Sequence, residues 1–255
     1  MDPNRPVDNS RVRTAVEAFA ADPNQRTSLD VLRACLLDGE LLMDITGSQV
    51  QTTPEGQLAP GSSLAFAGGA GPDGRGALFA FTSAREIARM HPDGTQVQSL
   101  GQPATGALEQ AVGDEHTGWL YIDPAGPTCA LARSEIEFAL GFARNDAVRT
   151  ALEPDTPREQ LIAALRADGP LLMGLDAGAD PDRPQPRLVR APDGGTALIV
   201  ATSSIEVVAA HPHDGVVVTS SGEVAEQVRA RGWSGLLINP AGPWAFVPVA
   251  ELGPT

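Results

Sequence analysis

The spacing of apolar and polar positions along the chain predicts helices and strands in a fixed order. Apolar residues recur every three or four positions in residues 9–20 and 29–37, which favours amphipathic helices. Shorter apolar runs, such as residues 40–45, 76–82 and 119–122, are bounded by Gly, Pro, Asn or Asp and have the length of strands. The longest runs, for example ALIVATS, are too short to cross a membrane as a helix.

Several stretches of the sequence occur twice in the same order. VRTAV at residues 12–16 returns as VRTAL at 148–152, DGELLM at 38–43 returns as DGPLLM at 168–173, and IDPAGP at 122–127 returns as INPAGP at 238–243. Collinear repeats of this kind indicate a tandem duplication. We therefore predict a disordered N-terminal tail of residues 1–8, a first unit of residues 9–141 and a second unit of residues 142–255.

Each unit is predicted to contain helix, helix, three strands, helix, weak strand, helix, two strands and a short helix. The strands at residues 63–69 and 76–82, and at 187–191 and 196–202, are separated by PDG in both copies, which predicts hairpins. Antiparallel pairs mixed with helices indicate the α+β class, with a mixed and mostly antiparallel sheet flanked by helices in each unit.

Three helix starts match the capping box, in which a Ser or Thr side chain and a Glu three residues later bond to free backbone N–H groups. They are Ser83 with Glu86, Ser203 with Glu206, and Thr156 with Glu159. These residues are predicted to have a structural role.

The duplicated motif places Asp123 and Asn239 before a proline, at the end of an apolar strand. A short polar residue followed by Pro and Gly is typical of a turn. The alternative is that the carboxylate and the amide face a ligand. Because one copy has Asp and the other has Asn, a shared role in proton transfer is excluded, and the turn is the favoured interpretation.

Charge and composition exclude several classes of function. The chain has 18 basic and 32 acidic residues and a formal net charge of −14, which disfavours nucleic acid and anionic lipid as partners. It contains no lysine, which excludes a lysine Schiff base and a phosphate-binding loop of the GxxxxGK type. We expect no cofactor, no metal site and no catalytic residue. Because the first residues, MDPNRPVDNS, lack the pattern of a secretory signal, we expect the cytosol.

Aromatic residues gather near the second copy of the motif, at Trp233, Trp244 and Phe246. Such residues form the core of a domain when they are buried and the centre of a binding surface when they are exposed. The sequence favours the core but leaves both open.

Two further motifs point to a known family. The strand-to-helix junction FTSARE at residues 81–86, followed by GWLYIDPAGP in the first copy and GLLINPAGP in the second, resembles the SseB family of enhanced serine sensitivity proteins, in the tandem form found in actinobacteria. The resemblance covers about residues 9–252. It implies a cytosolic α+β domain without established catalytic residues, and some relatives resemble adaptor or chaperone modules.

Two hypotheses about function follow. The first is a non-enzymatic adaptor or chaperone-like protein of the bacterial cytosol, a monomer or weak homodimer, which contacts an unidentified protein partner through Trp233, Trp244 and Phe246. The second is a small-ligand sensor, for instance of an amino acid, with a pocket at the turns of Asp123 and Asn239. An enzyme ranks third.

Overall fold

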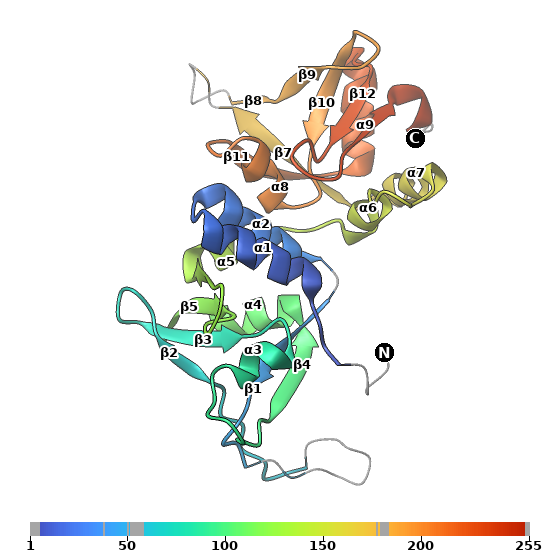
Figure 1. Ribbon diagram of the computed structural model, residues 1–255. Helices are drawn as coiled ribbons and strands as arrows, with labels where there is room; N and C mark the ends of the chain where they lie inside the picture. The colour runs from blue at the N-terminus through green and yellow to red at the C-terminus, as the bar shows by residue number, and fades with distance from the viewer. Residues whose placement is uncertain are drawn as a thin grey trace. The chain divides into compact units, whose positions relative to one another are not determined.

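The computed structural model describes residues 6–37, 39–49, 51, 59–176, 178 and 184–252. The chain divides into two compact units, unit 1 (Met1–Glu137) and unit 2 (Phe138–Thr255) (Figure 1). Within the described ranges, no helix combines the length and the apolar character needed to span a membrane.

Unit 1 begins with two packed helices, α1 (Ser10–Ala21) and α2 (Gln25–Leu36). The helix α1 starts at Asn9, whose side-chain oxygen accepts a hydrogen bond from the Val12 N–H at 3.1 Å. Val12 and Val16 are one turn apart and fully buried, as the helical spacing of apolar positions predicts.

The main sheet of unit 1 has the strand order β2-β3-β5-β6. Strands β3 and β5 are parallel, and each pairs with an antiparallel outer strand. A parallel pair requires a crossover, which here runs through α3, β4 and α4. Strands β1 and β4 form a second, small sheet, and Leu42 of β1 exchanges backbone hydrogen bonds with Phe81 after β3. The bounds are β1 (Glu40–Asp44), β2 (Gly68–Ala70), β3 (Gly76–Ala80), α3 (Ala84–Ala88), β4 (Ser99–Pro103), α4 (Ala104–Gly113), β5 (Thr117–Ile122), β6 (Cys129–Ala132) and α5 (Arg133–Leu140).

Unit 2 repeats this arrangement. Its main sheet has the order β9-β10-β12-β13 with a parallel pair β10–β12, and its small sheet has the order β11-β7-β8. The bounds are α6 (Asp146–Ala151), α7 (Arg158–Arg166), β7 (Pro170–Asp176), β8 (Gln185–Pro186), β9 (Leu188–Arg190), β10 (Thr196–Val200), α8 (Ser204–Ala210), β11 (Gly215–Ser220), α9 (Ser221–Arg231), β12 (Gly235–Ile238), β13 (Ala245–Pro248) and the 3-10 helix η1 (Val249–Glu251). The predicted α+β class and the element order of the duplication are confirmed; β8 is an addition that the sequence pattern did not predict.

The two faces of each main sheet have different environments. In unit 2 the inner face carries fully buried apolar side chains, which pack with residues of α6, α7 and α9. They are Leu198, Val200, Leu236, Ile238 and Val247. Side chains alternate along a strand, so Ile199, Leu237 and Phe246 point to the opposite, outer face, where they are only half-buried. The core therefore lies on one side of the sheet, and the outer face is partly open.

Both predicted hairpins are present, with Gly74 and Gly194 at the turns in the positive-φ region (80° and 86°). The strand predicted at residues 63–69 is shorter than expected, because β2 begins only at Gly68. The chain before it pairs elsewhere: Ser63 forms a β-bridge with Gln49, and the Ala65 N–H donates to Ser48 Oγ at 2.9 Å.

The predicted N-terminal tail, residues 1–8, lies outside the described residues for its first five positions. In the described part, Val7 packs against the cluster of Leu42, Phe81 and Ile87. Asp8 forms a bridge with Ser83 and an ion pair with Arg13 at 2.6 Å. The chain thus makes contacts with unit 1 before Asn9.

Candidate functional site

The duplicated motif forms the same tight turn in both units. Asp123 and Asn239 have positive φ angles of 54° and 50°, and both are almost completely buried. The Asp123 N–H donates to the Ala80 carbonyl, and the Asn239 N–H donates to the Val200 carbonyl, each at 3.0 Å. Residues with short polar side chains tolerate this left-handed backbone better than other non-glycine residues. The turn is the reason that the motif is repeated.

The side chains of the two turn residues bind the same threonine in each unit. Asp123 accepts from the Thr82 N–H at 2.8 Å through Oδ1 and from the Thr82 hydroxyl at 2.7 Å through Oδ2. Asn239 Oδ1 accepts from the Thr202 N–H at 2.9 Å, while its Nδ2 donates to the Thr202 hydroxyl at 2.9 Å. The threonine hydroxyl is a donor in unit 1 and an acceptor in unit 2, so an acid and an amide hold the same geometry.

The capping boxes predicted at Ser83 and Ser203 do not form, because the serine side chains do not make the expected hydrogen bonds. Ser83 and Ser203 do occupy the N-cap positions of α3 and α8, but within the described residues neither side chain makes a capping bond. Glu86 instead binds Arg89, with 2.6 Å between Oε2 and Nη1. A charged pair is stronger than a bond to a neutral N–H group, and Arg89 competes successfully for the carboxylate.

The third predicted box, Thr156 with Glu159, also fails. The N-cap of α7 is Pro157, and the Thr156 hydroxyl donates to the Thr150 carbonyl at 3.3 Å. Reciprocal capping boxes occur instead at α2, between Asn24 and Thr27, and at α9, between Ser220 and Glu223.

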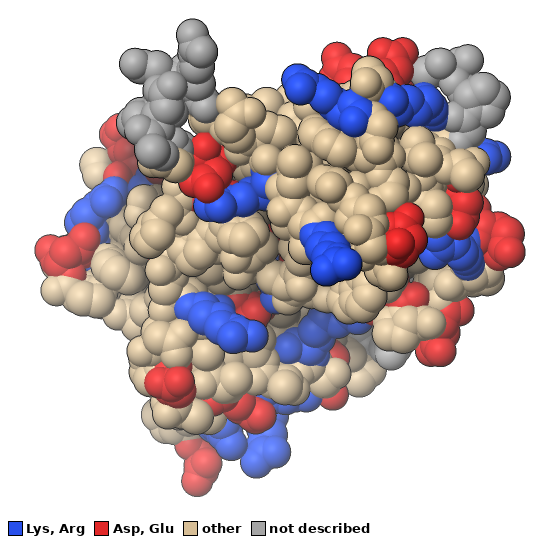
Figure 2. All heavy atoms as spheres, turned by 90° about the horizontal axis from the view of Figure 1, so that it is seen from above, with Lys and Arg blue, Asp and Glu red and all other residues tan. Residues whose placement is uncertain are grey.

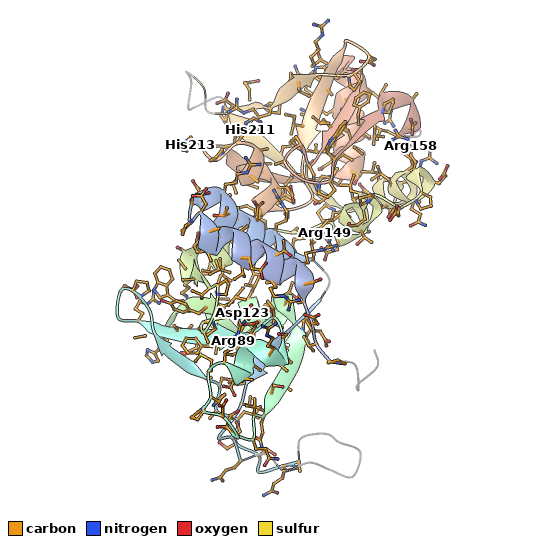
Figure 3. The ribbon with its side chains drawn as sticks, in the orientation of Figure 1. Arg89, Asp123, Arg149, Arg158, His211 and His213 are labelled. Carbon is orange, nitrogen blue, oxygen red and sulfur yellow. The ribbon has the colours of Figure 1, made fainter. Side chains whose placement is uncertain are left out.

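A polar cavity of about 260 Å³, here called the Asp123 pocket, lies beside the turn of unit 1. Three segments far apart in the sequence form it: α1, α3 and the turn after β5. Figure 3 shows Arg89 and Asp123 next to each other in this region. The lining residues are Arg13, Val16, Glu17, Arg85, Glu86, Arg89, Asp123 and Pro127.

Burial raises the pKa of the Asp123 carboxyl, and the charge of Glu86 raises it further, against the two hydrogen bonds from Thr82 and the attraction of Arg13, which lower it. An ionised carboxylate is therefore costly at this position. Neutral Asn239 avoids this cost in unit 2 while it makes the same contacts.

The equivalent place in unit 2 carries fewer charged side chains. Aligned on the repeats, Arg85, Arg89 and Asp123 correspond to Ile205, Ala209 and Asn239. Of the three arginines, only Arg13 aligns with another arginine, Arg149. Arg149 lies on α6 with its Nε at 3.5 Å from Asp146 Oδ1 (Figure 3). The two turns are alike, but at the positions of Arg85 and Arg89 beside the turn of unit 1, unit 2 has Ile205 and Ala209.

The outer face of the main sheet in unit 2 carries an apolar groove, here called the Trp244 patch. Its cavity measures about 250 Å³. The side chain of Trp244 is 60% exposed, the highest exposure of the large apolar side chains in the described part of the chain. The lining residues are Val189, Arg190, Ala191, Pro192, Ala197, Leu237, Pro240, Trp244 and Phe246.

The structure separates the three aromatic residues that the sequence grouped. Trp244 and Phe246 share the patch, whereas Trp233 is partly buried and packs against the core of unit 2. The sequence did not identify Val189 and Leu237 as part of the site. The period-two alternation of strands β9 and β12 is the signal that places them on the outer face.

Unit 1 carries different side chains at the positions of the two aromatic residues of the patch. Thr128 and Ala130 align with Trp244 and Phe246. The ring of Trp119 instead packs against Gly71, and its Nε1–H donates to Asp73 Oδ1 at 2.8 Å. Two aromatic rings, Phe79 and Tyr121, stack edge to face with centroids 5.9 Å apart.

Charged residues do not form a single-sign area on the face of the molecule drawn in Figure 2, where basic and acidic side chains are interspersed.

The two cysteines are buried and free, and burial raises the pKa of Cys35 to about 12 and also raises the pKa of Cys129. Thiols with raised pKa values are poor nucleophiles. Within the described residues there is no cluster of three His, Cys, Asp or Glu side chains that could hold a metal ion.

The fold and the repeated turn define a protein of two tandem α+β units, each with a mixed main sheet and a small sheet. Residues 12–137 and residues 145–251 each match the family model described as SseB protein N-terminal domain. The chain belongs to the SseB family and contains two copies of this domain. No curated protein and no solved structure matches the chain.

Proposed function

We propose that this protein is a non-enzymatic adaptor or chaperone-like protein that binds a protein partner through the Trp244 patch. The main support for this proposal is the exposure of Trp244 beside an apolar groove on the open face of a sheet. Tryptophan is enriched among the residues that dominate binding energy, and exposed apolar areas bordered by polar residues commonly mark interaction sites.

The groove suits an apolar segment of a partner. Leu237, Phe246, Pro192 and Pro240 are among the residues that line it. Prolines lose little conformational entropy on binding, which lowers the cost of ordering this part of the groove. The formal net charge of −14 favours a partner with an excess of basic residues and accelerates its approach.

The experiment is affinity purification from the cells that naturally produce the protein, with quantitative mass spectrometry. The bait is the tagged wild-type chain, compared with Trp244→Ala and with Val218→Ala. Val218 is 45% exposed on β11 and does not line the patch, which makes it a matched control. Because a hot-spot tryptophan contributes about 2 kcal/mol or more, binding to Trp244→Ala should weaken about thirtyfold.

The supporting result is one near-stoichiometric partner that is retained by wild type and Val218→Ala and lost by Trp244→Ala. Circular dichroism should show that all three chains fold. A partner that binds Trp244→Ala as tightly as wild type contradicts the role of the patch, and the absence of any specific partner in repeated preparations contradicts the proposed function.

A second function, sensing of a small ligand such as an amino acid, is favoured by the Asp123 pocket alone. Its volume of about 260 Å³ lies just below the roughly 300–1,000 Å³ of sites for drug-sized molecules, so it suits a smaller metabolite. A thermal-shift screen tests this function, since a ligand at 100 times its dissociation constant stabilises the folded protein by about 2.7 kcal/mol.

A further inference from the structure

We infer that the Asp123 pocket of unit 1 binds a small carboxylic acid bearing a hydroxyl or amino group, and that Arg85 and Arg89 hold its carboxylate. This inference rests on the small-ligand function proposed above. It adds the chemical class of the ligand, assigns the site to unit 1 and names the residues that recognise it.

The arginines of the pocket have donors to spare. A guanidinium carries five N–H donors in a planar fork that matches a carboxylate. Arg89 uses Nη1 for Glu86 and Arg13 uses Nη1 for Asp8, each at 2.6 Å. Arg85 makes no side-chain hydrogen bond or ion pair with the described residues. An incoming carboxylate can therefore be bound without breaking the existing ion pairs.

The pocket also contains acidic side chains. Glu17 and Glu86 line the same cavity as the arginines, and Glu86 uses only Oε2 for its ion pair with Arg89. Carboxylate oxygens accept hydrogen bonds from a hydroxyl or an ammonium group. A ligand with a carboxylate at one end and a donor at the other complements both sets of side chains, whereas a simple anion complements only the arginines.

The fold does not require these arginines. Unit 2 builds the same turn and the same short helix with Ile205 and Ala209 at the positions of Arg85 and Arg89. It also replaces the buried Asp123 carboxylate by the amide of Asn239 with no loss of hydrogen bonds to the threonine. The charges of unit 1 are thus an addition to a scaffold that folds without them, which points to binding rather than to stability.

The test measures binding by isothermal titration calorimetry and by NMR shifts of arginine side-chain N–H groups. The probes are L-lactate and L-alanine, each paired with its amide, L-lactamide and L-alaninamide, which differs by the loss of the carboxylate. The variants are Arg85→Ile and Arg89→Ala, which copy unit 2, and Arg26→Ile as the control. Arg26 is an exposed arginine of α2 outside the pocket.

Binding of an acid but not of its amide, weakened about tenfold or more by Arg85→Ile and unchanged by Arg26→Ile, supports the inference. Arg85→Ile is the decisive variant because Arg85 is exposed, so its replacement leaves no buried partner behind. Acid and amide binding equally well, or equal affinities of wild type and Arg85→Ile, overturn the inference and leave the small-ligand function standing. No binding of any probe overturns both.

Discussion

Unit 1 and unit 2 place a carboxylate at the same point of their small sheets by different routes. In unit 1 the carboxylate belongs to Asp44 on β1, and its Oδ2 lies 2.7 Å from His91 Nε2. In unit 2 the aligned residue is Gly174, and a Cβ added there would lie only 2.8 Å from Asp214 Oδ2. The carboxylate of Asp214, from the segment between α8 and β11, therefore fills the space that the missing side chain leaves.

The partner of the carboxylate differs as well. Arg187 binds Asp214 with both prongs of its guanidinium, at 2.9 Å and 2.7 Å. The duplicated fold therefore has a carboxylate at the same position in space in both units, although a different residue supplies it. The Asp123 turn shows the opposite case. Asp123 and Asn239 occupy the same position in the repeat, but only Asp123 can carry a charge.

The largest effect is expected for Gly174→Asp, which gives unit 2 the residue of unit 1 while Asp214 remains. Two carboxylates would then compete for one buried place and one arginine, and we expect a loss of about 3 kcal/mol in the free energy of unfolding. Urea denaturation measures it. The double variant Gly174→Asp with Asp214→Gly should recover part of the loss, and an equal loss in both variants would show that competition with Asp214 is not its cause.

The two helix caps give the next effect. Asn9 caps α1 and also donates to the Glu40 carbonyl at 3.2 Å, whereas Asn145 caps α6 and its Nδ2 is buried without a hydrogen-bond partner in the described residues. We expect Asn145→Ala to cost about 1 kcal/mol and Asn9→Ala to cost more, toward about 2 kcal/mol. Hydrogen exchange of the α1 and α6 amides separates the two units. Equal costs would mean that the Asn9–Glu40 bond contributes nothing.

A smaller effect is expected for Asp123→Asn, which copies unit 2. The folded-state pKa of Asp123 is raised, so its stabilising contribution is full below the unfolded value of about 3.9 and is lost as the pH rises through the folded value. The charged groups that face it are Arg13, Glu17, Arg85, Glu86 and Arg89.

Asp123→Asn does not titrate at this position, so its stability relative to wild type should increase between pH 4 and pH 7, by about 1 kcal/mol or less. Hydrogen exchange of the Thr82 amide, followed over this pH range, measures the difference in unit 1. A constant difference across the range would show that the carboxyl is not perturbed.

The smallest effects are expected for Ser83→Ala and Ser203→Ala. Their side chains make no capping bonds within the described residues, so each change should alter the free energy of unfolding by less than about 0.5 kcal/mol. Thermal unfolding measures it. A loss near 1 kcal/mol would show that these hydroxyls do cap their helices in solution.

The sequence predicted the duplication, the order of elements and the turn, because repeats and local patterns report on local structure. It did not predict which hydrogen bonds the side chains make. Glu86 matches a capping box, but the stronger partner Arg89 takes its carboxylate. The identity of Trp233 and Trp244 as tryptophans does not decide their exposure, and it is the packing of the core that covers one and leaves the other exposed. The Asp123 pocket joins three distant segments, so no local pattern could reveal it.

The exchange of donor and acceptor roles at the threonine hydroxyl has a genetic consequence. Asp and Asn codons differ by a single base, and both residues keep the turn closed through the same threonine. One point mutation can therefore remove the negative charge from this corner of the domain while the turn stays intact. A gene duplicated in tandem is free to use that route in one copy while the other copy stays as it was.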